Sequence, residues 1–361
     1  MTGPRLLILE GDGIGPEIVR ATLGVLKAAD AAFGLGLRFV AGTVGFEALE
    51  REGTTIPAAV IDAARAADGI VLGPVSHNDY PPVAEGGLNP SGVLRKSLDL
   101  SANIRPARTP EGLGKGQPVN LVTVRENTEG FYADRNMHAG PGEFMPDPDM
   151  ALAVRKITRR ASRRIAEAAF ALAATRPGRH VTAVHKANVL RLSDGLFLQE
   201  CRAAAEAHPA IRYDEVLVDA MAAHLVRDAS RYDVIVTTNM YGDILSDLAA
   251  ELAGGLGLAG SLNAGEAHAM AQAQHGSAPD IAGRGVANPA SLIASAAMLL
   301  DWLAARRGDE ALERAARGIE AGLAAALRDP ATRTPDLGGT ASTETMSRVV
   351  ADWIGTGEGA A

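Results

Sequence analysis

The sequence has almost no cysteine and no long uncharged apolar run. A single cysteine, Cys201, among 361 residues excludes an intrachain disulfide and a cluster of thiolate metal ligands. The longest uncharged stretch, between Arg284 and Asp301, contains a proline and serines, and no run reaches the roughly 20 apolar residues of a membrane helix. Residues 1–10 lack the basic head and small-residue cleavage site of an export signal. We therefore expect a cytoplasmic protein that does not enter a membrane.

The sequence also lacks a strong excess of charge of either sign. Lys and Arg number 35 and Asp and Glu 43, a formal net charge of −8, and both signs are scattered along the chain. This pattern disfavours nucleic acid or an anionic membrane as the main partner, but a local group of arginines could still bind an anionic small molecule. A length of 361 residues suggests two domains, or one large sheet domain with an insertion.

Short apolar segments alternate with alanine-rich helical stretches along the chain, which is typical of an α/β protein. The chain opens with a strand candidate at residues 6–9, a glycine turn and a helical pattern at 18–29. Further strand candidates are residues 69–73, 120–124, 180–184 and 233–237. Between residues 128 and 150 the alternation stops, and glycines and prolines mark a long irregular arm, which is usually functional or intersubunit.

The glycine turn resembles a dinucleotide-binding fingerprint only in part. Gly11, Gly13 and Gly15 follow the first strand, but Pro16 stands where the third glycine of G-x-G-x-x-G belongs. A tight strand-to-helix turn without a ligand is an equally good interpretation. The turn contains no Gly-Lys-Ser/Thr sequence, so a P-loop is excluded.

Three aspartates are candidates for a divalent-metal site. Asp243 and Asp247 follow the strand-like residues 234–236, and on a helix they would lie one turn apart on one face. Asp219 follows the strand-like residues 216–218. Hard carboxylate oxygens suit Mg²⁺ or Mn²⁺. The alternative for the first two is an acidic first turn that complements the helix dipole.

Three arginines lie in apolar stretches of the sequence, and one lysine follows a strand candidate. Arg95, Arg105 and Arg125 could bind carboxylates through their guanidinium forks, although an arginine considered alone is more often a surface or ion-pair residue. Lys186 directly follows the strand candidate at residues 180–184 and His185. Near other cations such a lysine can act as a base, and otherwise it is a solvated strand-end residue.

Taken together and in order, these segments resemble the β-decarboxylating dehydrogenases, which act on isocitrate, homoisocitrate, isopropylmalate and tartrate or D-malate. The resemblance covers nearly the whole chain. Its most specific stretches are residues 11–17, 94–96 with 102–106, 125–130, 185–189, 241–247 and 275–283. The resemblance implies an α/β fold of two domains that is not a Rossmann domain. The larger, cofactor-binding domain would comprise residues 1–101 and 254–361, and the smaller, metal-binding and dimerisation domain residues 102–253 with the arm near 128–150.

The resemblance also implies a role for individual residues. It assigns Tyr132 and Lys186 to catalysis, with Asn188 beside the lysine as a substrate contact. The substrate-carboxylate clamp would be Arg95, Arg105 and Arg125, and the ligands of Mg²⁺ or Mn²⁺ would be Asp219, Asp243 and Asp247. The loop for the adenosine half of the cofactor would comprise His275, Gly276, Ser277, Ala278, Pro279, Asp280, Ile281 and Asn288.

Two further expectations concern the cofactor and the partner. Asp280 and Ile281 occupy positions where NADP-linked relatives carry Lys-Tyr, and an aspartate repels a 2′-phosphate, so we expect NAD. In the resembling family the counterparts of Lys186 and Asp219 reach into the partner's cleft. The resemblance therefore implies a homodimer with shared active sites and the arm as its clasp.

The choice of substrate is read from the turn before Arg95. Isocitrate enzymes carry Ser-x-Asn there and isopropylmalate enzymes a glutamate with leucines, whereas this chain has Asn89 and Ser91, in reversed order. An unsatisfied polar pair against an isopropyl group would cost about 1 to 3 kcal/mol, so we expect isocitrate-like or homoisocitrate-like malates to be preferred. The alternatives are 3-isopropylmalate, tartrate or D-malate as substrate. Asn89 and Ser91 could also merely cap a helix that carries Arg95.

The chain departs from the family just before the cofactor loop, and two other classes of protein have to be considered. The family usually has Phe-Glu-x-Val-His-Gly, whereas residues 271–276 read Ala-Gln-Ala-Gln-His-Gly, which puts nicotinamide-side contacts in doubt. A non-catalytic regulatory subunit would have lost catalytic groups, and this chain keeps Tyr132, Lys186 and the aspartates. A phosphoryl-transfer protein would need a phosphate-gripping lysine loop, which the sequence lacks.

Overall fold

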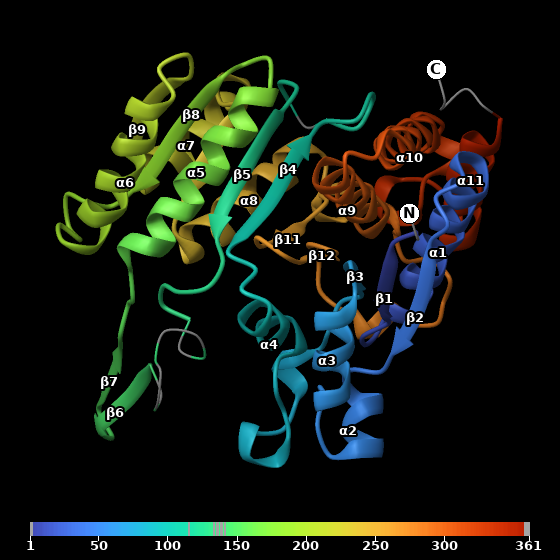
Figure 1. The fold of residues 1–361 in the computed structure, drawn as a ribbon, viewed down its shortest axis with the longest axis horizontal. Coiled ribbons are helices and arrows are strands. Elements are labelled where there is room, and N and C mark those ends of the chain that lie inside the picture. The colour runs from blue at the N-terminus through green and yellow to red at the C-terminus, as the bar shows by residue number, and fades with distance from the viewer. Residues whose placement is uncertain are drawn as a thin grey trace.

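The fold is organised around one long mixed sheet (Figure 1). The structure, a computed structural model, describes residues 3–356 except 115, 133, 135, 136, 138, 139 and 141. In the described residues this sheet has ten strands in the order β2-β1-β3-β12-β11-β4-β5-β10-β8-β9. Its strands are β1 (Arg5–Leu9), β2 (Arg38–Gly42), β3 (Gly69–Leu72), β4 (Ala102–Arg108), β5 (Asn120–Glu126), β8 (His180–His185), β9 (Arg212–Leu217), β10 (Val234–Thr237), β11 (Leu262–Ala264) and β12 (Ala269–Gln272).

Strand direction changes in the middle of the sheet. At both ends neighbouring strands are parallel, but β4 runs antiparallel to β5 and β11, and β11 runs antiparallel to β12. A Rossmann domain binds its dinucleotide on an open, mostly parallel sheet of two similar halves. The expectation of an α/β fold other than a Rossmann domain is therefore confirmed.

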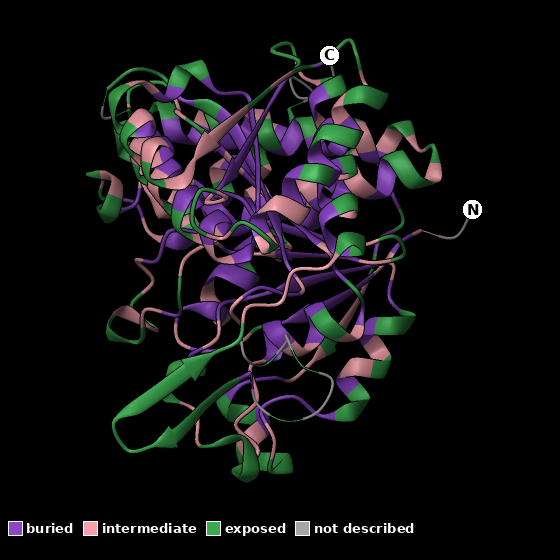
Figure 2. Cartoon of the chain, turned by 90° about the vertical axis from the view of Figure 1, so that its left-hand side faces the viewer, coloured by how far each residue is buried: buried purple, intermediate pink, exposed green. Residues whose placement is uncertain are grey.

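Helices cover both faces of the sheet (Figures 1 and 2). They are α1 (Gly15–Phe33), α2 (Phe46–Glu52), α3 (Ala58–Ala66), α4 (Pro90–Ser97), α5 (Arg159–Thr175), α6 (Ser193–Ala207), α7 (Val218–Asp228), α8 (Asn239–Ala253), α9 (Ala290–Arg307), α10 (Glu310–Arg328) and α11 (Thr343–Gly355). Among the described residues, no helix is both long and apolar enough to cross a membrane.

Four apolar clusters hold these layers together. One joins α1, α9, α10 and α11 to the β1-β3-β12 part of the sheet, and a second joins α3 and α4 to the same strands. The other two join α5 and α6, and α7 and α8, to the β5-β10-β8 part. Phe170 of α5 is fully buried in this second half, and truncating such a side chain to alanine typically costs about 3 to 5 kcal/mol.

The expected strands are present, and three local details differ from the sequence interpretation. Asp219 is not at the end of a strand but in the first turn of α7, because β9 ends at Leu217. The helix expected near Asp243 begins earlier, at Asn239. The arm is not irregular throughout, since β6 (Glu143–Asp147) and β7 (Met150–Ala153) form an exposed antiparallel hairpin that projects from the body (Figures 1 and 2).

Candidate functional site

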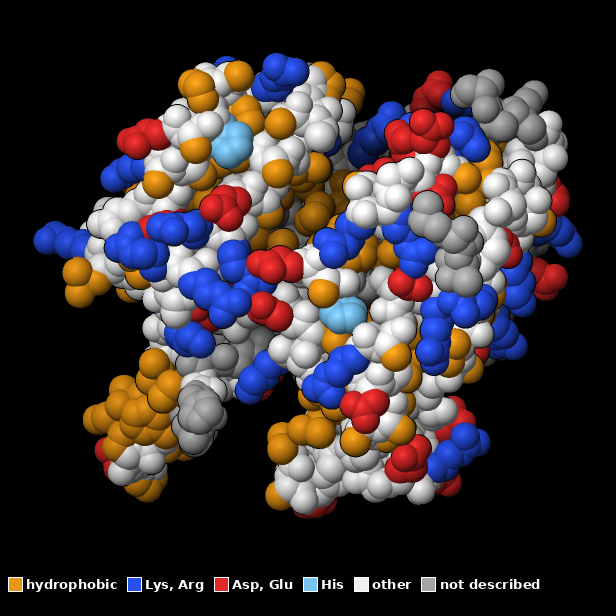
Figure 3. Space-filling model, viewed as in Figure 1, with side chains coloured by type: hydrophobic (Ala, Val, Ile, Leu, Met, Phe, Trp, Pro, Cys, Tyr) orange, Lys and Arg blue, Asp and Glu red, His pale blue; other side chains and the backbone are white. Residues whose placement is uncertain are grey.

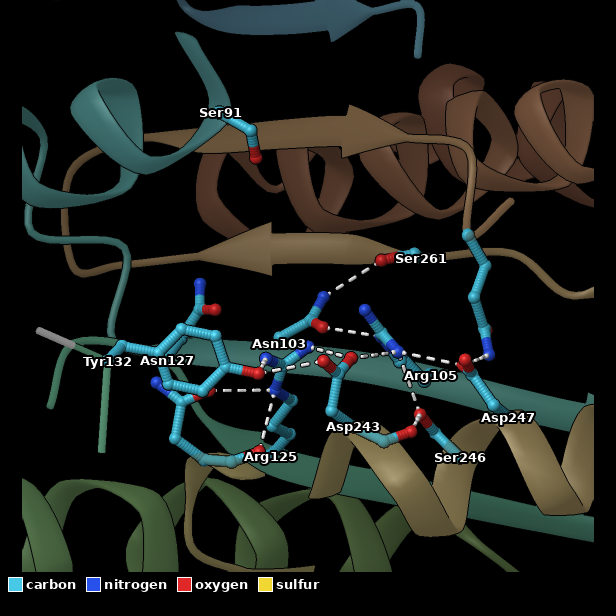
Figure 4. A network of polar contacts seen from close by, with 12 residues as sticks. Ser91, Asn103, Arg105, Arg125, Asn127, Tyr132, Asp243, Ser246, Asp247 and Ser261 are labelled. Carbon is cyan, nitrogen blue, oxygen red and sulfur yellow. Dashed lines mark hydrogen bonds and ion pairs between the residues drawn. The ribbon is translucent and has the colours of Figure 1, made fainter. Parts of the chain in front are cut away.

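Two of the predicted arginines meet two of the predicted aspartates over the middle of the sheet (Figure 4). Arg105 of β4 and Arg125 of β5 lie on adjacent antiparallel strands. Arg105 pairs with Thr123, two residues before Arg125. Nη1 of Arg105 lies 3.0 Å from Oδ1 of Asp243 and 3.2 Å from Oδ1 of Asp247. Nη1 of Arg125 donates to Oδ1 of Asp243 at 2.5 Å. The sheet thus presents two guanidinium groups to one face of α8.

The local sequence explains why α8 can approach so closely. A Cβ atom on Gly242 would lie 2.6 Å from Cγ of Arg125, so any other residue would push the helix away from β5. Asp243 and Asp247 are one turn apart on α8 and face the arginines together, as the spacing predicted. Asp243 is not in the first turn, so an acidic cap of the helix dipole does not account for it.

Electrostatics keep Asp243 ionised. Burial alone would raise the pKa of this carboxyl group, but the positive charges of Arg125 and Arg105 and a hydrogen bond from Tyr132 outweigh burial and lower the pKa. Tyr132 donates to Oδ2 of Asp243 at 2.8 Å, and its hydroxyl accepts from Nη2 of Arg125 at 2.9 Å. The predicted catalytic tyrosine therefore lies directly against the arginine and aspartate group.

The third arginine reaches the site from α4. Arg95 is 8% exposed, and its Nη2 donates to Oε1 of Gln272 at 3.1 Å. Asn89 is the N-cap of α4, where its Oδ1 accepts from the N–H of Gly92. Asn89 therefore caps the helix that carries Arg95, which was the alternative to a role in substrate choice. Ser91 does not cap the helix but donates its hydroxyl proton to Gln272 at 2.9 Å.

Lys186 and Asp219 do not join this group within one chain. Nζ of Lys186 lies 2.6 Å from Oδ1 of Asp219, which holds the pKa of that carboxyl below its ordinary value. Asp219 has 64% of its side-chain surface exposed and Lys186 26%. Asn188 is also exposed, on the turn after β8. Predicted catalytic and metal-binding groups therefore stand at an accessible surface, away from Asp243.

The donor set for a metal ion is incomplete in one chain. Among the residues that the structure describes, no three His, Cys, Asp or Glu side chains come together to hold an ion. Asp243 and Asp247 fit two of the positions, with oxygen ligands of the kind that Mg²⁺ and Mn²⁺ prefer. Asp219, the third predicted ligand, is exposed and does not lie in this group.

The predicted cofactor loop lines a cavity of about 430 Å³ beside the glycine turn. The lining includes His275, Gly276, Ala278, Ile281 and Asn288 of the predicted loop. The turn supports the loop, because the N–H of Ile14 donates to the carbonyl oxygen of Ser277 at 2.8 Å, and a Cβ on Gly13 would lie 2.1 Å from that oxygen. The glycines of the turn therefore admit the backbone of this loop.

The chemistry of the cavity fits a nucleotide. Burial lowers the pKa of His275 and keeps its ring neutral, and within the described part of the chain its buried Nε2 has no hydrogen-bond partner. Asn288 donates to Asp336 at 2.9 Å at the cavity wall. Ser277 bonds Ser76 instead, and Pro279 and Asp280 are exposed beside the cavity.

Several residues of the site were missed by the sequence interpretation. Asn103 accepts from Nε of Arg105 at 2.6 Å, and Asn239 accepts from Nε of Arg125, so two buried amides orient the guanidinium groups. Gln274 donates to Oδ1 of Asp247 at 2.8 Å, and Gln272 holds Arg95. The two glutamines stand where the chain departs from the family pattern, and that departure was the signal that could have revealed them.

Known proteins match this chain over nearly its full length. The family model described as isocitrate/isopropylmalate dehydrogenase matches residues 5–350. The isocitrate/homoisocitrate dehydrogenase of Thermus thermophilus is 42% identical over 348 residues, 96% of this chain and 98% of that protein. The 3-isopropylmalate dehydrogenase of Archaeoglobus fulgidus is 39% identical over 355 residues, 97% of this chain and 99% of that protein. The crystal structure of isocitrate dehydrogenase from Methylococcus capsulatus superposes with a TM-score of 0.86 at 39% identity, covering 98% of this chain and 99% of that one.

Fold, site and matches together define the class: the chain is an enzyme, a dehydrogenase that catalyses an oxidative decarboxylation. It belongs to the isocitrate/isopropylmalate dehydrogenase family. The resemblance inferred from the six sequence stretches is thereby confirmed, and a protein of the phosphoryl-transfer class is ruled out.

Proposed function

We propose that this enzyme uses NAD and a divalent cation to oxidise and decarboxylate a 3-substituted malate, with isocitrate-like or homoisocitrate-like acids preferred. The observation that carries the proposal is the group formed by Arg105, Arg125, Tyr132, Asp243 and Asp247 over the middle of the sheet. This group combines three kinds of side chain within hydrogen-bond distance of one another. The arginines can bind the carboxylates of a substrate, the aspartates can bind a cation, and the tyrosine carries a hydroxyl group.

Each of the proposed site residues has its own role in the reaction. Arg95, Arg105 and Arg125 bind the carboxylates of the acid and fix its orientation. Lys186 takes the proton of the C2 hydroxyl as C2 is oxidised, and Tyr132 delivers a proton to C3 after carbon dioxide leaves. NAD⁺, held by the loop that contains His275 and Asn288, would accept the hydride of C2, and Mg²⁺ or Mn²⁺, held by Asp243 and Asp247, would supply positive charge.

Tyr132 is well placed for its role. Its hydroxyl contacts both an arginine and an ionised aspartate, and these contacts hold the oxygen at one position next to the carboxylate clamp. Lys186, on the turn after β8, pairs with the exposed Asp219 of α7, and the structure shows neither of them in contact with the group around Asp243. The proposed reaction therefore requires a second copy that brings its Lys186 and Asp219 to the cleft.

A homodimer is supported by the distribution of exposed apolar side chains. The β6-β7 hairpin exposes Phe144, Met145, Met150 and Leu152, and orange side chains gather on this arm in Figure 3. Exposed apolar residues also occur on the body of the same half of the molecule: Leu192, Val226 and Ile244. Large exposed apolar patches mark protein contacts, and we propose that two copies pair through this half with the arms as clasps.

We further propose the division into two domains, residues 1–101 with 254–361 and residues 102–253. The separate apolar clusters on either side of β11 and β4 support it, because each half packs its own helices on its own part of the sheet. The cavity lined by the cofactor loop belongs to the first unit, and Asp243 and Asp247 belong to the second. Substrate bound between them would be enclosed by both.

The proposed substrate class can be tested by a panel. NADH formation with Mn²⁺ is measured for isocitrate, homoisocitrate, tartrate, D-malate and 3-isopropylmalate, and kcat/KM is compared. We expect isocitrate or homoisocitrate to lead, and Ser91→Ala to reduce kcat/KM for them by roughly tenfold, the effect of about 1.4 kcal/mol. A clear lead for 3-isopropylmalate would overturn the substrate preference but keep the reaction class. Absence of NADH from every acid would overturn the proposed function.

A further inference from the structure

The turn that carries Lys186 is held by a buried carboxylate group. Asp194, in the first turn of α6, is fully buried, and its Oδ2 accepts a hydrogen bond from the backbone N–H of Lys186 at 2.5 Å. The N–H of Asp194 in turn donates to the carbonyl oxygen of Leu190 at 3.0 Å. The turn after β8 is therefore closed around this one side chain, which fixes the backbone from which the side chain of Lys186 extends.

The other oxygen of Asp194 is bound by an arginine at the base of the arm. Arg155 lies two residues after the end of β7, and only 8% of its side chain is exposed. Its Nη1 donates to Oδ1 of Asp194 and, at 3.0 Å, to Oγ of Ser193. Its guanidinium group lies over the rings of Phe131 and Tyr241, 5.6 and 5.3 Å from their centroids. Arg155 is therefore held in one position, and it sets the orientation of Asp194.

A carboxylate satisfies both neighbours of this position, and the amide of the same shape cannot. Arg155 and the N–H of Lys186 are both donors, and they bind different oxygens of Asp194. An asparagine has one oxygen, which would turn to the arginine because hydrogen bonds to charged groups are the stronger ones. Its NH₂ group would then face the N–H of Lys186, and two donors that face each other repel.

We propose that Asp194, fixed in turn by Arg155, is a positioning residue for Lys186. The inference rests on the proposed function, in which Lys186 takes a proton in the cleft of a second copy. Asp194 acts through the backbone of Lys186, so its loss should slow the chemical step. Rates depend steeply on such geometry, since a misplacement of about 1 Å can cost on the order of 100-fold.

The first test compares Asp194→Asn with the control Glu206→Gln, an exposed change of the same kind near the end of α6. Asp194→Asn keeps an acceptor for the buried guanidinium group and nearly the same volume, so the chain should still fold. We expect its kcat to fall at least tenfold while KM for NAD stays within threefold. Glu206→Gln should match the parent enzyme. A kcat of Asp194→Asn within twofold of the parent would overturn the inference.

A competing route has to be separated, because Arg155 also touches the helix that carries the predicted metal ligands. Its Nη2 donates at 2.9 Å to Oγ1 of Thr238, the residue before α8. Through this contact the loss of Asp194 would disturb the chain's own cleft. Through Lys186 it would disturb the cleft of the partner.

Heterodimers decide between the two routes. Paired with a Tyr132→Phe subunit, an Asp194→Asn subunit should regain about one working site, because its own Tyr132 meets an undisturbed Lys186 from the other subunit. Paired with a Lys186→Ala subunit it should regain none, because neither cleft then receives a positioned lysine. Recovery with Lys186→Ala, or none with Tyr132→Phe, would overturn the inference when Lys186→Ala and Tyr132→Phe complement each other.

Amide hydrogen exchange supplies a readout that needs no turnover. In Asp194→Asn the exchange of residues 186–192 should become at least tenfold faster, while residues 196–207, the rest of α6, exchange as in the parent. If the parent oxidises none of the acids, or if Lys186→Ala and Tyr132→Phe do not complement each other, it is the proposed function that fails. Hydrogen exchange then decides alone whether Asp194 holds the turn, and an unchanged rate for residues 186–192 would show that it does not.

Discussion

The ammonium group of Lys186 lies 2.6 Å from Oδ1 of Asp219, on an accessible surface away from Asp243. The sequence predicted Lys186 as a catalytic residue and Asp219 as a metal ligand, yet in one chain they bind each other and not the arginine cluster. This arrangement is expected if Lys186 and Asp219 serve the cleft of a second copy, because association of the two copies would then bring the pair into that cleft.

Sharing of the active site predicts complementation between two inactive variants. Lys186→Ala and Tyr132→Phe homodimers should each be nearly inactive. In a mixed dimer one cleft would combine an intact Tyr132 with an intact Lys186 from the other subunit, so about one working site should return per mixed dimer. Activity is measured after the two tagged variants are unfolded, refolded together and isolated as heterodimers. Heterodimers that stay as inactive as the parents would contradict sharing.

The sequence predicted the strands that carry the site better than the contacts between them. The common helix face of Asp243 and Asp247 was anticipated from their spacing, but the pairs of Arg105 and Arg125 with Asp243 were not. The middle of the sheet could not be predicted, because β11 and β12 are short. The pairing of β11 with β4 and of β12 with β3 also joins residues far apart in the sequence. Gln272 acquires its contacts only through that pairing.

Removal of divalent metal should abolish turnover. Asp243 and Asp247 present carboxylate oxygens without histidine or thiolate, a set that suits Mg²⁺ or Mn²⁺. We expect dialysis against a chelator to eliminate NADH formation and added Mn²⁺ to restore it. Asp243→Asn should weaken the stimulation by Mn²⁺, whereas Asp62→Asn, an exposed change on α3, should not. Full activity after exhaustive chelation would remove the metal from the mechanism.

Loss of the Tyr132 hydroxyl should affect the chemical step much more than binding. General-acid groups in position typically contribute roughly 10²- to 10⁴-fold, so Tyr132→Phe should lower kcat by about that factor while KM for the acid changes far less. The matched control is Tyr213→Phe, which removes a hydroxyl bonded to Glu215 on β9. A Tyr132→Phe enzyme within twofold of the parent kcat would mean that the proton donor is another group.

The enzyme should prefer NAD⁺ over NADP⁺. Asp280 is exposed beside the cavity whose wall includes Ile281, and its charge would repel a 2′-phosphate there. We expect a higher kcat/KM with NAD⁺ than with NADP⁺. Asp280→Asn should reduce the ratio of these two kcat/KM values by on the order of tenfold, the effect of about 1.4 kcal/mol. Asp352→Asn on α11 serves as the control. A higher kcat/KM with NADP⁺ in the parent enzyme would reverse this interpretation.

Glu129 should make stability depend on pH near neutrality. Its buried carboxyl accepts hydrogen bonds from the N–H and the hydroxyl of Thr158, the N-cap of α5. Burial raises its pKa to about 7, with the nearby Glu126 adding to the shift and the Thr158 hydrogen bonds opposing it. Between the ordinary value near 4.5 and about 7 the native state binds more protons than the unfolded state, so its stability falls as pH rises through this window.

The variant Glu129→Gln removes this titration and should change the pH profile in a defined direction. Relative to the parent, its melting temperature should rise as the pH is taken from 5 to 8, because only the parent has to bury a charge at the higher pH. Thr158 can still donate to the amide oxygen of glutamine, so the helix start keeps an acceptor. Glu167→Gln, an exposed change on the same helix, should track the parent at every pH. Parallel melting profiles of Glu129→Gln and the parent across this range would show that the carboxyl does not titrate there.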